Sequence, residues 1–160
     1  MTILIRAFAL AVFSIVPFVA LAQHSAAAAS TAYTPPLSDL MLIAQLRHIK
    51  VWLAGSAGNW ALAGFELHEL EEVFEHAAKI HPKLDDSTPV GQMIETIVMK
   101  PISDLAAAID AHDRAKFVVA FDNLTAACNA CHQAANRPYL VVQRPTGPGF
   151  FPNQSFTPTK

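Results

Sequence analysis

The sequence predicts an all-α fold, an antiparallel four-helix bundle, and three observations support this prediction. Apolar residues recur every three or four positions in four segments between residues 37 and 137, which is the period of an amphipathic helix. Short stretches that contain Gly, Pro, Ser or Asp separate these segments, so neighbouring helices are expected to be antiparallel. No segment alternates apolar and polar residues convincingly enough to be a strand.

The composition fits one domain and excludes several classes of protein. A chain of 160 residues suits a single domain with one core. The 11 Lys and Arg residues against 13 Asp and Glu residues leave a net charge of -2, which gives no electrostatic reason to expect nucleic acid as a partner. The 2 cysteines exclude a disulfide-rich scaffold and a four-cysteine zinc site.

Residues 1–22 have the features of a secretory signal peptide. Arg6 supplies a positive charge, residues 7–19 form an apolar run, and the small residues Ala20 and Ala22 precede an expected cleavage site. The apolar run is short for a membrane-spanning helix and contains a proline, which favours cleavage over anchoring. We therefore expect export, to the periplasm in a bacterium, and no stable membrane span.

The first two helices are expected at residues 37–54 and 60–80, after a flexible leader at residues 23–36. Asn59 is a suitable N-cap for the second helix. The apolar stripe of the first helix consists of Leu37, Met41, Ala44, His48 and Val51. The stripe of the second consists of Leu67, Leu70, Phe74 and Ala77. Its other side, with Glu72 and Glu75, is expected to face the solvent.

The third helix is expected to begin with Thr88 as its cap and Pro89 in its first turn. Its stripe consists of Val90, Ile94, Ile97, Pro101, Leu105 and Ala108, and the proline within it predicts a kink near Met99 or Lys100. The fourth helix is expected at residues 114–136, with an inner stripe of Phe117, Phe121, Leu124 and Cys128.

The last segment, residues 138–160, is predicted to be an extended tail outside the helical domain at 37–137. Four prolines prevent a regular helix there, at positions 145, 148, 152 and 158. Phe150, Phe151 and Phe156 indicate that the tail packs back on the helices.

The fourth helix ends in the sequence Cys128-Asn129-Ala130-Cys131-His132, which has the C-x-x-C-H spacing of c-type haem attachment. Two thiols three residues apart stand on one side of a helical turn, so each can add to a vinyl group of the same porphyrin. The next imidazole can then reach the iron as an axial ligand. We therefore expect one covalent haem, with Cys128 and Cys131 as attachment sites and His132 as ligand.

Three other interpretations of the cysteine pair remain open at this stage. The pair could form a structural disulfide, a thioredoxin-type redox pair or half of a metal site. A redox pair is typical of a βαβ context, which this sequence does not predict. A zinc or copper site would need ligands beyond the 2 cysteines.

With this motif on the last of four predicted helices, residues 37–137 resemble the cytochrome c-prime family, which includes the low-spin cytochromes c556. The resemblance implies thioether bonds at Cys128 and Cys131, His132 as axial ligand, and a homodimer formed through the first two helices. The chain departs from the family pattern in two places. It has Asn136 where the family usually has a basic residue, and it continues well past the motif, so we expect a divergent member.

The resemblance also implies that the first helix offers the residue on the other side of the iron. Met41 and His48 share the inner stripe of that helix, and either could be the distal ligand. If Gln45 matches a Gln of the family's first helix, His48 takes the distal position. The alternatives are that Met41 is an ordinary core residue and that His48 is a polar residue at the surface.

These expectations lead to an exported electron carrier that works with a periplasmic redox protein. An open iron would instead bind NO or CO, or support peroxidase-like chemistry with His48 as an acid–base group. No catalytic triad, paired-carboxylate site or phosphate loop can be argued from the spacing of the residues, so the sequence does not predict an enzyme.

Overall fold

Helices account for most of the described structure. The computed structural model describes residues 33–147, 151 and 153–158, so the predicted signal peptide and most of the predicted leader lie outside the described residues. The elements are α1 (Leu37–Ser56), α2 (Trp60–Ile80), α3 (Val90–Met93), the π-helical turn η1 (Ile94–Val98), α4 (Met99–Asp110) and α5 (Arg114–Ala134). Within the described ranges there is no strand, which confirms the all-helical prediction.

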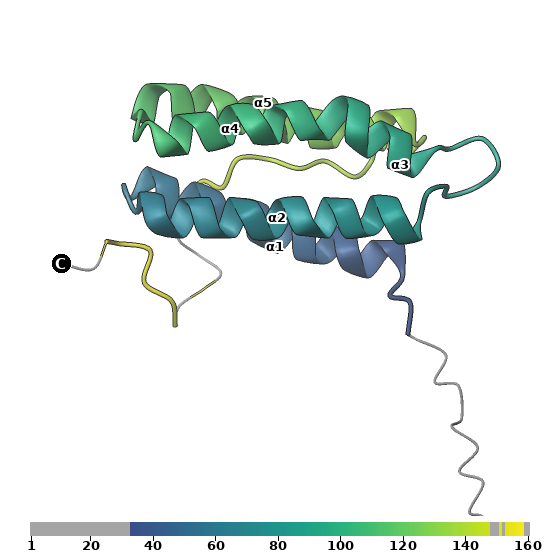
Figure 1. Cartoon of the computed structure of the whole chain (residues 1–160), viewed down its shortest axis with the longest axis horizontal. Coiled ribbons are helices and arrows are strands. Elements are labelled where there is room, and N and C mark those ends of the chain that lie inside the picture. Colours follow the sequence, from purple (N-terminus) through teal and green to yellow (C-terminus); the bar gives the residue numbers. More distant parts are fainter. Residues whose placement is uncertain (1–32, 148–150, 152, 159–160) are drawn as a thin grey trace, which may run out of the picture. The chain divides into compact units, whose positions relative to one another are not determined.

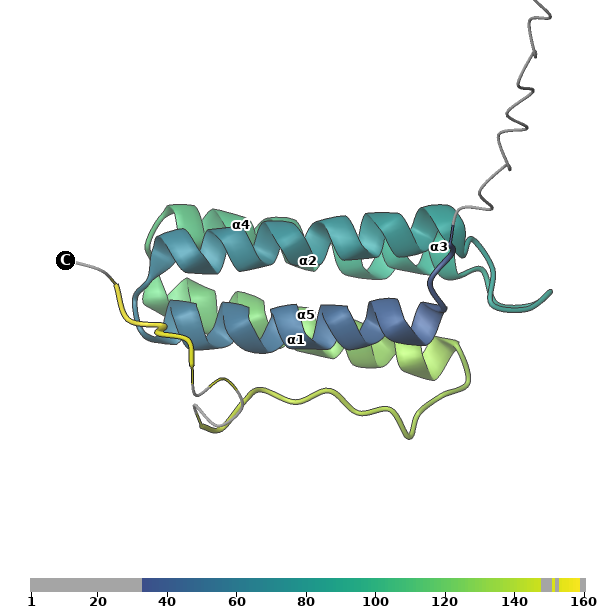
Figure 2. The same ribbon diagram turned by 90° about the horizontal axis from the view of Figure 1, so that it is seen from below.

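The helices pack in two pairs around a shared core (Figures 1 and 2). The chain reverses between α1 and α2, and these two helices contact each other along their length. In the second pair α4 packs against α5, and α4 also contacts α2, whereas α1 and α5 approach each other at few positions. This arrangement is compatible with a helical bundle. Among its most deeply buried side chains are Leu70, Ile102, Leu105, Phe117, Phe121 and Leu124.

The caps of α2 and α5 are formed by polar side chains, as helix starts require. Asn59 accepts a hydrogen bond from the Leu62 amide at 3.2 Å, which confirms the predicted cap of α2. Asp113 accepts one from the Lys116 amide at 3.0 Å at the start of α5. The prediction for α3 was wrong, because Pro89 itself is the N-cap and no side chain bonds to the first turn.

The π-helical turn η1 changes which residues face the core. A π turn contains an extra residue, so it rotates the following helix relative to a regular α-helix. Val98 and Ile102 are therefore buried, whereas Ile97 and Pro101, which the regular pattern placed inside, are only partly buried. The interruption also lies before the kink expected near Met99. Pro101 has no amide hydrogen for the carbonyl four residues earlier, which favours irregular bonding just before it.

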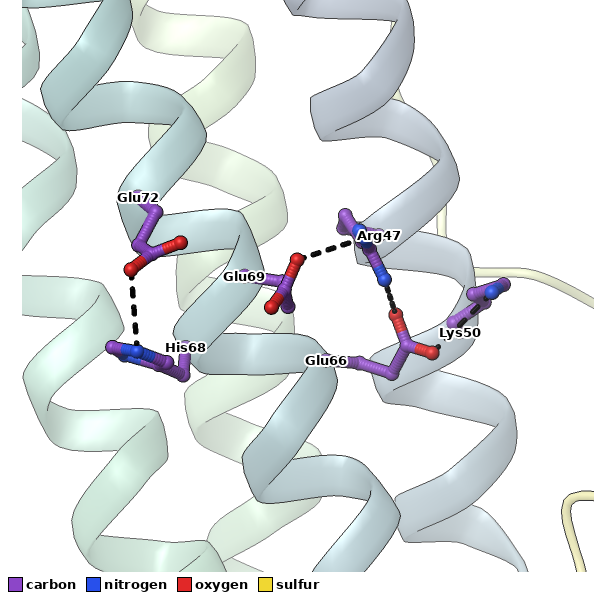
Figure 3. Close-up of polar contacts among 6 residues, drawn as sticks. All are labelled: Arg47, Lys50, Glu66, His68, Glu69 and Glu72. Atoms are coloured by element: carbon purple, nitrogen blue, oxygen red, sulfur yellow. Dashed lines mark hydrogen bonds and ion pairs between the residues drawn. The ribbon is translucent and has the colours of Figure 1, made fainter.

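A buried carboxylate connects α1 to α2 (Figure 3). Glu66 of α2 is 1% exposed, and its two oxygens accept from Arg47 at 2.7 Å and Lys50 at 3.3 Å. The other terminal nitrogen of Arg47 donates to Glu69 at 2.8 Å. Two cations thus compensate the desolvation of one buried charge, and this constrains how the two helices pair. Glu72 and Glu75 of the same helix, which were predicted to face the solvent, are exposed.

Gly55 of α1 lies directly against the ring of Phe117 of α5. An added Cβ there would lie 2.1 Å from the ring of Phe117, which is fully buried. We expect Gly55→Ala to destabilise the protein by about 2 kcal/mol, because a packed core ring has to move. Urea unfolding would measure this effect. Gly64→Ala is the matched control, since its Cβ would meet only Ile109 at 3.7 Å. If the two variants were equally stable, the close packing at Gly55 would be contradicted.

None of the helices in the described part of the chain combines the length and the apolar character that crossing a membrane requires.

Candidate haem-attachment site

The C-x-x-C-H motif lies in the last two turns of α5, which ends at Ala134. Cys128 and Cys131 are one turn apart, partly buried and packed against the hydrophobic core, and they do not form a disulfide. The Cys131 thiol lies 3.8 Å from the Met93 carbonyl, so its side chain is directed toward α3. Both thiols are thus available on the inner side of α5, and the structural-disulfide interpretation has no support.

The environment of the thiols also disfavours a thioredoxin-type redox pair. Burial, and secondarily the neighbouring Cys131, raises the pKa of Cys128 to about 12. Burial raises the pKa of Cys131 to about 11. Both cysteines are therefore neutral thiols at pH 7, whereas reactive redox cysteines have pKa values well below the ordinary one.

The third interpretation, half of a metal site, requires additional ligands near the cysteines. Among the residues that the structure describes, no group of three or more His, Cys, Asp or Glu side chains is placed to hold a metal ion. The motif itself provides one imidazole, which could ligate a haem iron, and two thiols, which could attach the porphyrin.

The imidazole of His132 is held by the chain that follows α5. Its Nδ1 lies 2.7 Å from the carbonyl oxygen of Leu140. Because a carbonyl only accepts, Nδ1 carries the hydrogen, and in the neutral ring Nε2 keeps its lone pair. Histidines that bind metals through Nε2 often donate from Nδ1 in this way. His132 therefore has the tautomer that an axial ligand needs.

His48 is 2% exposed, so the alternative of a polar surface residue is wrong. Its ring packs against Phe121, with ring centroids 4.4 Å apart, and its Nε2 lies 2.8 Å from Thr125 Oγ1. The Thr125 hydroxyl donates to the Phe121 carbonyl at 2.9 Å, so it accepts from Nε2 of His48. Nδ1 of His48 is then a buried lone pair without a hydrogen-bond partner. Burial lowers the pKa of His48 to about 4, so the ring is neutral at pH 7.

The contact between α1 and α5 shows how far along the bundle axis each of the two predicted distal residues lies from His132. The helices run in opposite directions (Figure 2), and His48 lies beside Thr125. Met41 is seven residues before His48 (48 − 41), and His132 is seven residues after Thr125 (132 − 125). At 1.5 Å per residue both shifts are about 10 Å in the same direction, so Met41 lies level with His132. Met41 is partly buried and contacts the core.

Two polar residues near the motif make contacts that the sequence does not predict. Thr125, one turn before Cys128, holds His48, and Asn129, inside the motif, pairs with Val142. A buried threonine at an inner-stripe position was a weak signal, because Thr on helices often bonds to its own backbone. The partner of Asn129 lies in an irregular segment, and no sequence periodicity indicates such a contact.

Two cavities lie elsewhere on the protein. One, of about 560 Å³, is lined by Trp60, Phe65, His112 and their neighbours. The other, of about 530 Å³, lies over the acidic face of α2. Neither includes a residue of the C-x-x-C-H motif. Comparison of the chain with protein-family models, curated proteins and solved structures finds no match.

Proposed function

We propose that this protein is an exported c-type cytochrome that carries one covalent haem and transfers electrons in the periplasm. The observation that supports this most directly is the state of the motif on α5. Two unpaired thiols lie one turn apart on its inner side, and they precede a histidine whose Nδ1 is already hydrogen-bonded. A haem bound there would supply an iron that gains and loses one electron.

Each residue of the motif has a separate task in this proposal. Cys128 and Cys131 would each form a carbon–sulfur bond, the thiol adding across a vinyl double bond and its hydrogen passing to the second vinyl carbon. His132 would bind the iron through Nε2. Because both cysteines are packed against the core, the helices around them would exclude water from the bound group.

We propose Met41 as the second axial ligand, in preference to His48. Met41 lies level with His132, and no hydrogen bond has to be broken to free its thioether. His48 lies level with Thr125, to which its Nε2 is bonded at 2.8 Å. Ligation through Nε2 would break this hydrogen bond, so His48 would have to bind through its buried Nδ1 instead. A Met and a His on one iron are typical of low-spin electron carriers of raised potential.

The proposal also includes the topology of the bundle, the export of the protein and its partners. The helix pairs are compatible with the antiparallel four-helix bundle of the cytochrome c-prime family, with residues 138–160 as an added tail. The signal-like residues 1–22 support export with cleavage near Ala22. The resemblance supports a homodimer through the first two helices, and the redox partner would be another periplasmic protein.

The mass and the N-terminus of the full chain, expressed with its leader in a bacterium that matures c-type cytochromes, test this proposal. We expect a mature chain beginning at Gln23 that carries the mass of one haem, which acid–acetone does not extract. The Cys128→Ala, Cys131→Ala double variant should carry no covalent haem. His68→Ala is the matched control, because His68 is exposed and its ion pair is with Glu72, outside the motif. Haem that is extracted from the folded wild-type chain, or a mass without haem, would contradict the proposal.

A further inference from the structure

The segment that follows α5 returns along the side of the bundle where α1 and α5 meet (Figure 2). We call residues 138–144 of this segment the strap. It contains neither helix nor strand. Before it, two residues after the end of α5, lies Asn136, which has a left-handed φ of 57°. Such a residue reverses the chain after a helix. The strap therefore passes back over the motif that it follows.

The strap contacts α5 through alternate residues. The Leu140 carbonyl accepts from His132 Nδ1 at 2.7 Å. Two residues later Val142 forms a matched pair of hydrogen bonds with the Asn129 side chain, its amide donating at 2.8 Å and its carbonyl accepting at 2.9 Å. Asn129 thus uses its amide oxygen and its amide nitrogen on one strap residue, which fixes the height of the strap along α5.

The end of the strap is held by a third contact. Arg144 donates to Asp122 of α5 through two nitrogens, Nε at 2.8 Å to one oxygen and Nη2 to the other. Its guanidinium also lies over the ring of Trp52 of α1, 4.8 Å from the ring centre. A two-point ion pair combined with cation–π stacking restricts orientation as well as distance. The strap is therefore anchored on both helices that flank this side of the bundle.

We propose that the strap positions the axial imidazole, with the Leu140 carbonyl holding the ring plane and the Nδ1–H tautomer of His132. The inference rests on the proposed function, because it assigns the strap a role toward a haem bound by this histidine. A hydrogen bond from Nδ1 makes Nε2 a stronger donor, and a stronger donor stabilises the ferric state over the ferrous state. The strap thereby lowers the reduction potential.

Three chains test this inference: the full chain, a chain that ends at Gly147 and a chain that ends at Arg137. The second loses the rest of the tail but keeps the strap, so it controls for general effects of truncation. We expect equal potentials in the first two. In the third chain, the preference for the ferric over the ferrous state should fall about tenfold. For a one-electron couple this is a rise of about 59 mV in the reduction potential. Side-chain ¹⁵N NMR of the same three chains without haem should show the His132 proton held on Nδ1 in the first two only, since iron bound at Nε2 would itself keep that proton on Nδ1.

A point variant tests the anchor without shortening the chain. Asn129→Ala removes both hydrogen bonds to Val142 and leaves the C-x-x-C-H spacing intact. It should raise the potential in the same direction as the loss of the strap. The matched control is Gln133→Ala, since Gln133 is exposed on the same helix next to His132 and its side chain takes no part in the strap.

The outcomes separate this inference from the proposed function. Equal potentials in all three haem-carrying chains, or a His132 proton on Nε2 in the haem-free full chain, would overturn the positioning role. A full chain without covalent haem would overturn the proposed function and with it the effect on potential. The NMR measurement on that chain would still decide whether the strap holds His132.

Discussion

Replacing Met41 by Ala is expected to convert a low-spin, six-coordinate spectrum into a high-spin spectrum whose ferrous form binds CO. Met41 lies level with His132 across the antiparallel α1 and α5, so its loss would remove the second axial ligand. Absorption spectra of the ferric and ferrous protein, with and without CO, measure the change. We expect it to be complete, because Ala has no group that can reach or bind the iron.

His48→Ala is the matched variant for this experiment. Because His48 packs on Phe121 and bonds to Thr125, this variant should stay low-spin and lose stability instead. If His48→Ala became high-spin and Met41→Ala did not, His48 would be the ligand and Met41 would not. A wild-type ferrous protein that is already high-spin and binds CO would instead favour the gas-binding function.

The free energy of unfolding is expected to fall by about 3 kcal/mol as the pH drops from 6.5 to about 4, through His48 alone. Burial lowers the pKa of His48 from 6.5 to about 4 in the folded protein. Between these values the unfolded chain binds a proton that the folded protein excludes, so acidification favours unfolding. The contribution of the neutral, buried His48 to stability is complete above pH 6.5. Between pH 6.5 and about 4, each pH unit lowers the free energy of unfolding by about 1.4 kcal/mol. Urea unfolding at pH 7 and pH 4.5 measures this loss.

His48→Leu should remove this part of the pH dependence. Thr125 keeps its hydrogen bond to the Phe121 carbonyl in this variant, so no new buried donor is left unpaired. His68→Leu is the control and should retain the wild-type pH profile, since His68 is exposed. If His48→Leu lost as much stability on acidification as the wild type, another group would be responsible.

The order of the helices could be predicted from the sequence because each one carries its own apolar period and its own cap. The bounds of α2, Trp60–Ile80, agree with the prediction, and Asn59 caps it as expected. The apolar stripe predicted for the third helix was wrong between Ile94 and Leu105, where two of its residues are only partly buried. A π turn inserts a residue into the repeat, and neither composition nor period signals where it forms.

The candidate site also has features that the sequence could predict and features that it could not. The spacing of Cys128, Cys131 and His132 is a local property of one helix, so the sequence could predict it. The burial of His48 could not be predicted, because its stripe position allowed either a core or a surface place. What decided it was the packing of α1 against Phe121 and Thr125 of α5. Met41 and His48 share one stripe in the sequence, and the match of Gln45 favoured His48, whereas the register between the two helices favours Met41.

The sequence by itself determined the helical class, the motif and its donor atoms, since periodicity and spacing lie within one segment of chain. The tertiary structure decided which nitrogen of His132 is free, because that depends on the Leu140 carbonyl in a segment without periodicity. It also decided that His48 is neutral at pH 7, through burial between two helices. Hydrogen bonds and desolvation of this kind arise only when distant segments meet.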